Sequence, residues 1–259
     1  MAPAGKKALS DKKALVTGAG RGIGRAVAFE LADAGADLVL LARSADQLAD
    51  ARTALVEHGV DEGRVQLVSA DLGDVADRER ALAEIRKLGR IDILINNAAV
   101  VEPLGPTSEV SEADLRHAFE VNVFAVSALT NALLPAMVEA GWGRIANVSS
   151  GIVARPDSMV RANAYAATKA ALEAHTVNLA AELRGTGVTA NVYRPGLVDT
   201  SMQAHIRAQA PERVGDAMHE KFTQHVTDGL LITPRQSAAS LVGRLEGDAT
   251  GEVWVVDRA

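Results

Sequence analysis

The sequence predicts an α/β fold in which one doubly wound, parallel sheet of about seven strands carries helices on both faces. The first observation is an alternation, from end to end, of short apolar runs with longer alanine-rich stretches. The second is composition: hydrophobic residues make up 48% of the 259 residues but aromatic residues only 3%. The core is therefore built from Val, Leu, Ile and Ala. The third is that alternating elements with short connections favour parallel strands joined by right-handed crossovers.

The predicted strands are apolar nearly throughout, which is typical of strands that helices cover on both faces. They are the runs 14–17, 38–41, 65–68, 91–95, 144–148, 188–192 and 252–256.

The predicted helices have apolar residues at helical spacing and recognisable ends. Ile23, Val27 and Leu31 recur every fourth residue and share one helix face. Ser44 and Ser111 each stand before a helical stretch with a polar residue three positions on, a pattern typical of a helix start. Helices should end at Gly35, Gly59, Gly89, Gly141 and Gly185.

No repeat, low-complexity tract or linker interrupts this rhythm, so residues 1–259 are predicted to form a single domain with a tail at 1–10. Only the stretch from 200 to about 233 departs from it. We expect an inserted helical segment there, after the sixth strand, that helps bind substrate. Met202, Met218 and Phe222 in this segment are as compatible with a pocket lid as with ordinary packing.

Composition excludes several classes of function. The chain has no cysteine, which rules out disulfides, thiolate metal sites and a cysteine nucleophile. Lys+Arg 27 against Asp+Glu 33 gives 27 − 33 = −6, without the basic stripe of a nucleic-acid binder. We find no secretory signal, no apolar stretch approaching about 20 residues and no metal-binding histidine spacing. A cytoplasmic protein without membrane, metal or nucleic-acid partners is expected.

A glycine-rich loop follows the first strand and leads into a helix, in the order Thr17-Gly18-Ala19-Gly20-Arg21-Gly22-Ile23-Gly24. Gly18 permits the turn, Gly20 and Gly22 let a pyrophosphate approach the backbone, and Gly24 lets the helix pack closely. The helix N-terminus favours an anion. Because strand and helix are both present, we interpret this as a dinucleotide site rather than a plain glycine-rich turn.

The second strand indicates which dinucleotide binds. Its end reads Leu41-Ala42-Arg43-Ser44, with Ala42 where an NAD site has an acidic residue. A guanidinium suits a 2′-phosphate, and Arg21 could supply a second one. The sequence therefore predicts NADP(H), with NAD(H) less favoured. The alternative is that both arginines are solvated loop charges.

A tyrosine and a lysine one helical turn apart follow the fifth strand. That strand ends Ser149-Ser150, and Tyr165 and Lys169 share a face of the next helix. Tyrosine has a pKa near 10, and a neighbouring cation should lower it toward the range useful for acid–base work. Tyr-x-x-x-Lys is common by chance, but its place after Ser-Ser in a chain with a nucleotide loop favours chemistry.

Together these motifs resemble the short-chain dehydrogenase/reductase family over about residues 12–256. The glycine loop, Asp71, Asn96-Asn97-Ala98-Ala99, Asn122, the Ser150/Tyr165/Lys169 set and Pro195-Gly196-Leu197-Val198-Asp199-Thr200 match in order. The resemblance implies a Rossmann-like fold and an oxidoreductase that moves a hydride between NADP(H) and a carbonyl or secondary alcohol. A ketone or 3-oxoacyl-thioester reductase is the most concrete form of that expectation.

The resemblance also implies roles for the matching residues. Tyr165 would be the general acid or base, Lys169 would lower its pKa and hold the nicotinamide ribose, and Ser150 would bind the substrate oxygen. Asn122 would anchor a water of the proton relay. The remaining cofactor contacts would be Gly18, Gly20, Arg21, Gly22, Ile23, Gly24, Arg43, Asp71, Leu72, Asn97, Pro195, Gly196, Val198 and Thr200.

Two choices stay open at this point. In the family's pattern the catalytic serine is the last of the Ser-Ser pair, which favours Ser150 over Ser149. The choice stays open because the gap from Ser150 to Tyr165 is slightly longer than usual for the family, with 156–161 carrying the extra length. The function could instead be that of a non-catalytic NADP-sensing regulator on the same fold.

Helices at about 115–140 and 162–184 are apolar on more than one face, so a homodimer or homotetramer is expected.

Overall fold

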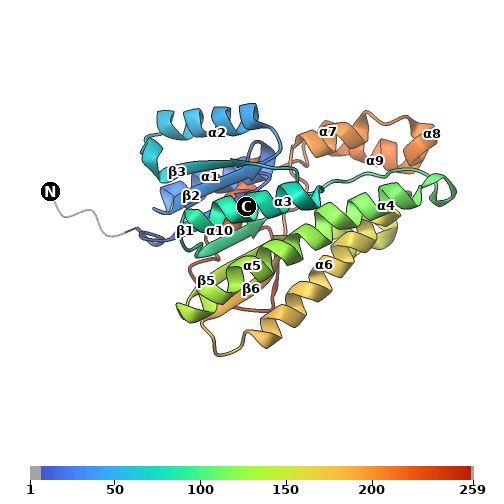
Figure 1. The fold of residues 1–259 in the computed structure, drawn as a ribbon. Coiled ribbons are helices and arrows are strands. Elements are labelled where there is room, and N and C mark those ends of the chain that lie inside the picture. The colour runs from blue at the N-terminus through green and yellow to red at the C-terminus, as the bar shows by residue number, and fades with distance from the viewer. Residues whose placement is uncertain (1–6, 258–259) are drawn as a thin grey trace.

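The computed structural model of the chain describes residues 7–257. One parallel sheet of seven strands lies at its centre, in the order β3-β2-β1-β4-β5-β6-β7 (Figure 1). The doubly wound parallel sheet is therefore confirmed, and each predicted apolar run overlaps a strand. The strands are β1 (Lys13–Thr17), β2 (Asp37–Ala42), β3 (Val65–Ser69), β4 (Ile93–Asn96), β5 (Gly143–Val148), β6 (Val188–Arg194) and β7 (Val253–Val255).

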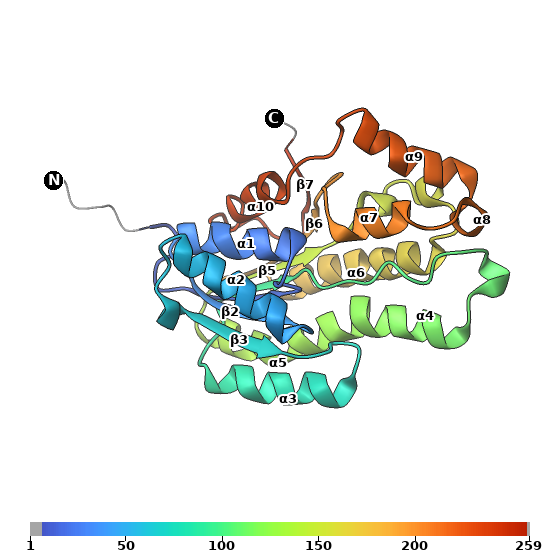
Figure 2. The same ribbon diagram turned by 90° about the horizontal axis from the view of Figure 1, so that it is seen from above.

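Helices cover both faces of the sheet (Figure 2). Buried side chains of α1 (Gly22–Asp33), α2 (Ala45–Glu57) and α10 (Pro234–Val242) form one apolar cluster with the strands. Those of α3 (Val75–Lys87), α5 (Ala125–Glu139) and α6 (Asn163–Glu182) form a second cluster with the strands. The five inner strands are thus buried on both sides, as their uninterrupted apolar sequences predict, whereas the edge strands β3 and β7 each expose part of one face.

The helix ends are set by the predicted residues. Ser44 Oγ accepts a hydrogen bond from Gln47 N at 3.2 Å, and Ser111 Oγ accepts one from Asp114 N at 3.1 Å. All five predicted stop glycines have positive φ, as at Gly35 with 97°. Only glycine adopts that backbone without strain, so helix ends are readable from local sequence.

The long apolar stretch predicted near 115–140 has a more complex geometry. Helix α4 (Glu112–Phe119) passes through a π-helical turn, Glu120–Phe124, into α5. By length and composition alone, these 28 residues could cross a membrane, as found in a search of residues 7–257. The expectation that no apolar stretch approaches this length is therefore wrong. The most apolar window of these 28 residues is 44% buried against the rest of the protein, and the buried helix of a layered fold passes the same test.

Beyond one end of the sheet, the segment after β6 forms three short helices, α7 (Ser201–Arg207), α8 (Pro211–Val214) and α9 (Asp216–Thr227) (Figure 1). The inserted helical segment is thus present, and its apolar residues pack on Tyr165. The expected tail at 1–10 is shorter than predicted, because Leu9 is buried in the core and its N–H donates to Ala34 O at 2.9 Å. Residues 1–6 lie outside the described part of the chain.

Candidate active site

A cavity of about 1000 Å³ lies at the carboxyl ends of the strands, where the strand order reverses between β1 and β4. Ligands bind at this place in open α/β sheets. Of the predicted site residues, Gly24 and Asn122 do not line the cavity. Those that do are Gly18, Gly20, Arg21, Gly22, Ile23, Arg43, Asp71, Leu72, Asn97, Ser150, Tyr165, Lys169, Pro195, Gly196, Val198 and Thr200.

The glycine loop is packed tightly enough that side chains would not fit. A Cβ added at Gly24 would lie 2.4 Å from Gly18 O and 2.5 Å from Asn97 Nδ2. Glycine at 24 therefore brings α1 close to β1, the packing role expected for it. Asn97 ties this loop to β4: its Nδ2 donates to Thr17 O at 2.9 Å, and its backbone N–H donates to Thr17 Oγ1 at 2.9 Å.

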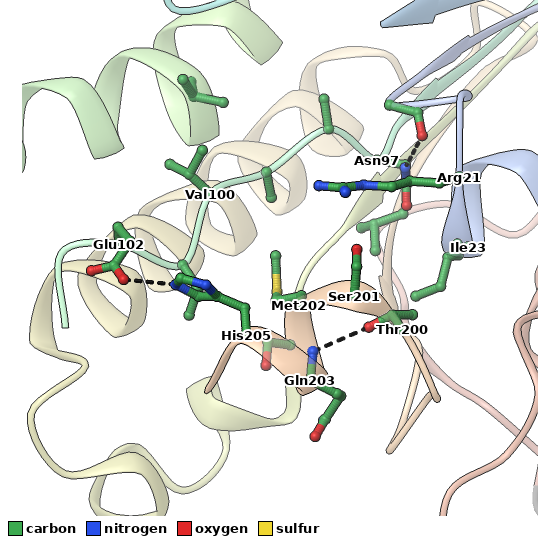
Figure 3. Close-up of a pocket in the computed structure, with 18 of the residues that line it drawn as sticks. Arg21, Ile23, Asn97, Val100, Glu102, Thr200, Ser201, Met202, Gln203 and His205 are labelled. Carbon is green, nitrogen blue, oxygen red and sulfur yellow. Dashed lines mark hydrogen bonds and ion pairs between the residues drawn. The ribbon is translucent and has the colours of Figure 1, made fainter. Parts of the chain in front are cut away.

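Two arginines and an aspartate surround the outer end of the cavity. Figure 3 shows Arg21 extending from the glycine loop into it. Arg43 Nη1 lies 3.8 Å from Asp71 Oδ2, and their side chains are 64% and 42% exposed. Such an exposed pair is weak, so Arg43 can turn to an incoming anion at little cost. Ala42 lines the cavity without adding a negative charge.

Tyr165 and Lys169 project from α6 into the inner end and are both buried. Lys169 Nζ donates to Val148 O at 2.8 Å and lies 5.8 Å from the centre of the Tyr165 ring. Burial raises the pKa of Tyr165 to about 12, although its hydrogen bond with Ser150 opposes this. Burial also lowers the pKa of Lys169 to about 8. The sequence-based expectation of a lowered tyrosine pKa is therefore not met in this structure, because burial disfavours the phenolate.

The structure separates the two serines by their partners. Ser150 lines the cavity, hydrogen-bonds with Tyr165, and its Oγ accepts from Ile152 N at 3.3 Å. Ser149 also lines the cavity, but its Oγ donates to Glu173 Oε1 at 2.6 Å. This arrangement favours Ser150 as the group that meets substrate.

Asn122 lies in the π-helical turn and is fully buried. Its Nδ2 donates to Val100 O at 2.9 Å and to Thr168 Oγ1 at 3.0 Å, and its Oδ1 accepts from Val100 N at 2.9 Å. The side chain therefore joins the segment after β4 to α6. It does not point into the cavity, so an approach to Lys169 would have to run through its backbone or a bound water.

Residues after β6 close the cavity beside the glycine loop. Thr200 Oγ1 accepts from Gln203 N at 3.4 Å and so caps α7 (Figure 3). A Cβ at Gly22 would lie 3.6 Å from Thr200 Cγ2, so the two segments are neighbours. Val198 pairs with Ile232 in an isolated bridge. The turn at Pro195-Gly196 is held close to the last strand, because a Cβ at Gly196 would lie 2.6 Å from Val256 Cγ1.

The inserted segment adds an apolar wall and one polar pair. Met202 and Phe222 line the cavity, whereas Met218 packs in the core. His205 Nε2 lies 2.8 Å from Glu102 Oε1, joining α7 to the segment after β4 (Figure 3). Of the other two histidines in this segment, His219 does not line the cavity, and burial lowers the pKa of His225.

Sequence reasoning missed several lining residues. Val100, Val101 and Glu102 line the cavity directly after the Asn-Asn-Ala-Ala run. Their place just beyond strand ends was the available signal. Gln47 also lines it, against Gly20. Across residues 7–257 no group of three or more His, Asp and Glu side chains is placed to hold a metal ion.

Comparisons with known proteins agree with this geometry. The short chain dehydrogenase family matches residues 12–211. L-2,3-butanediol dehydrogenase of Corynebacterium glutamicum is 33% identical over 255 residues, covering 95% of this chain and 97% of the relative. L-Sorbose reductase from Gluconobacter frateurii, solved with NADPH and L-sorbose, is 28% identical with a TM-score of 0.84 and 97% of each chain covered. A 3-oxoacyl-(acyl-carrier-protein) reductase from Agrobacterium tumefaciens C58, solved with NADP, is 29% identical with a TM-score of 0.82, covering 96% of this chain and 93% of the other.

Proposed function

The chain belongs to the short-chain dehydrogenase family, and from that premise we propose that it transfers a hydride between NADP(H) and a ketone or secondary alcohol. One observation carries the proposal. A single cavity has a glycine loop with Arg21 and Arg43 at one end and Ser150, Tyr165 and Lys169 at the other. A dinucleotide needs the first end, and proton transfer to a carbonyl needs the second.

The residues present fit NADP(H). Glycines keep the loop backbone open where a pyrophosphate would lie, and a helix N-terminus follows. Arg21 and Arg43 supply forked donors for a 2′-phosphate, and the strand end offers no carboxylate to the ribose at Ala42. When bound, the cofactor supplies or accepts the hydride. Both similar solved structures named above carry NADP or NADPH.

The chain's own residues would carry out the proton transfer. With a pKa near 12, Tyr165 is protonated at neutral pH and can donate to a carbonyl oxygen. Ser150, already hydrogen-bonded with Tyr165, would hold that oxygen and stabilise its developing charge. Lys169 carries a buried ammonium on the same helix face, which favours the phenolate left after donation. Asn122 would position its segment for the relay that returns a proton to Tyr165.

The substrate is proposed to be an uncharged ketone with an apolar substituent. The wall beside Tyr165 consists largely of apolar side chains, among them Val101, Met159, Met202, Ile206 and Phe222. Apolar walls bind apolar groups, and a few polar atoms orient them. A 3-oxoacyl thioester is compatible with this lining, and a similar protein is named as such a reductase.

We further propose a single cytoplasmic domain over 1–259 that assembles as a homodimer or homotetramer. Support for assembly comes from large apolar side chains exposed on α4, α5, α6 and the π-helical turn between α4 and α5, namely Leu115, Val138, Val177 and Phe124. Exposed apolar residues of this kind gather at interfaces. Light scattering on a size-exclusion column measures the mass, and a monomer would contradict the proposal.

The test of function compares three proteins in NADPH consumption across a panel of ketones. Tyr165→Phe should keep NADPH binding and lose about 10²- to 10⁴-fold in turnover, which is the usual rate contribution of positioned acid–base catalysis. Tyr193→Phe is the matched control, because Tyr193 is the other tyrosine, is buried, and donates to Ser237 O at 2.6 Å away from the cavity. Full activity in Tyr165→Phe would refute the mechanism. Binding of NADPH without turnover of any ketone would favour the regulator alternative.

A further inference from the structure

A buried carboxylate lies directly behind the wall that carries Tyr165 and Lys169. Glu173 Oε2 accepts from Arg194 Nη2 at 2.6 Å, and its Oε1 accepts from Arg194 Nε at 2.8 Å. Oε1 also accepts from Ser149 Oγ at 2.6 Å. The side chains of Glu173 and Arg194 are only 10% and 18% exposed. This cluster of Ser149, Glu173 and Arg194 has no part in the mechanism described above.

Its position links the three elements that present the site. Glu173 follows Lys169 by one turn of α6, and Tyr165 by two. Ser149 follows β5 and precedes Ser150. Arg194 ends β6 and precedes the Pro195-Gly196 turn. Each member of the cluster is therefore a chain neighbour of a proposed site residue or shares its helix face.

The charges of the cluster bear on Lys169. Lys169 is 2% exposed, and its ammonium donates to the neutral carbonyl of Val148. Burial lowers the pKa of Lys169, and the negative charge of Glu173 opposes that effect. Arg194 in turn pairs with Glu173 and offsets part of its charge. A buried ion pair is seldom retained for stability, since packed apolar residues of similar size do as well.

We propose that Glu173 and Arg194 are positioning residues for Lys169: the pair sets the charge balance behind the ammonium and joins α6 to the ends of β5 and β6. The negative charge of Glu173 favours the charged form of Lys169, and the positive charge of Arg194 limits that effect. Ser149 holds the Glu173 carboxylate in place through its hydrogen bond. This role rests on the proposed function only in treating Lys169 as catalytic.

Other titratable groups on the elements packed against α6 have partners of their own or are solvated. Glu120 in the π-helical turn is paired with Arg78 at 2.6 Å. On α4, Glu112 pairs with Arg116, Asp114 accepts from Ser111, and His117 is exposed. On β5, Arg144 donates to backbone carbonyls, including Gly143 O. On α6 itself the buried groups beside Lys169 are Tyr165 and Glu173.

The test follows the titration of Lys169 in four proteins: wild type, Glu173→Gln, Arg194→Met and the double variant. The pKa of Lys169 is read by NMR of protein labelled with ¹⁵N-lysine, with Lys169→Arg identifying its signal. Glu173→Gln leaves two buried cations and should lower this pKa by about one pH unit. Arg194→Met releases the carboxylate and should raise it by a similar amount. The double variant should return to within about half a pH unit of wild type.

Opposite signs distinguish a charge role from a merely structural one, because loss of a structural contact would affect both single variants alike. Shifts in the same direction, or no shift, would overturn the proposal. Should Glu173→Gln fail to fold, Arg194→Met decides alone: a raised pKa supports the proposal and an unchanged one refutes it. Glu120→Gln breaks an ion pair of the same 2.6 Å length outside the cavity and should leave the pKa of Lys169 unchanged.

Activity adds a separate readout. In the pH profile of kcat/KM for ketone reduction, the alkaline limb should move to lower pH in Glu173→Gln and to higher pH in Arg194→Met. A wild-type protein without ketone turnover would contradict the proposed function, yet the NMR titration would still decide this inference.

Discussion

Replacing Arg43 by alanine tests the cofactor assignment, because its contacts predict separate effects on folding and on NADPH. In the structure its only described ionic partner is Asp71, at 3.8 Å, and the arginine side chain is 64% exposed. Loss of such a pair changes the free energy of unfolding by about 1 kcal/mol or less. A hydrogen bond to a charged group is worth about 1.5–3 kcal/mol. That range corresponds to a loss of about 10- to 150-fold in kcat/KM for NADPH.

The assay is steady-state turnover of one ketone with NADPH and with NADH, together with thermal unfolding. Arg43→Ala should lower kcat/KM for NADPH and leave the value for NADH within about twofold, since NADH has no 2′-phosphate to lose. Arg52→Ala is the matched control, because its side chain is 39% exposed, lies 3.6 Å from Glu62, and does not line the cavity. An equal fall for both cofactors, or an unchanged ratio between them, would refute the reasoning.

Two further predictions concern packing and pH. Gly24→Ala should abolish NADPH binding and lower the melting temperature, because its Cβ would lie 2.4 Å from Gly18 O, whereas Gly151→Ala, with no atom within 4 Å of its Cβ, should change neither. Calorimetry measures the melting temperature and fluorescence titration measures NADPH binding. Wild-type values of both in Gly24→Ala would contradict the packing argument. Lys169 has a pKa of about 8 in the folded protein against an ordinary 10.5, so the unfolded chain binds more protons between these values and stability should rise with pH across that window. This pKa difference corresponds to about 3 kcal/mol in the free energy of unfolding. In denaturant unfolding at pH 7 to 10, Lys169→Met should remove the rise of this free energy with pH. An unchanged slope of the free energy against pH would argue against a depressed lysine pKa.

The cofactor end of the site was predictable because its geometry is local. The glycine loop, the strand before it and the helix after it are contiguous, and the close approach at Gly24 follows from that short segment. The same holds for Tyr165 and Lys169, which one turn of helix places on one face. The helix ends at Ser44 and Gly35 likewise depend on neighbours within a few residues.

Contacts between distant segments were not predictable in the same way. His205 and Glu102 are 103 residues apart in sequence, and nothing at either position indicates the other. The π-helical turn that carries Asn122 also escaped prediction. It has the apolar spacing of the helices on either side, and its altered hydrogen bonding is stabilised by contacts to Val100 and Thr168.

The sequence by itself determined the doubly wound parallel sheet, the dinucleotide loop and the residue types available for proton transfer. Each of these depends on patterns within one or two adjacent elements. Only the tertiary structure decided how the acid–base groups behave. A neighbouring cation is expected to lower the pKa of a solvated tyrosine, but burial among α6, α7 and α9 raises the pKa of Tyr165 to about 12. Desolvation is the sum of contacts from many segments, and the Glu173–Arg194 pair behind Lys169 arises only when α6 and β6 meet.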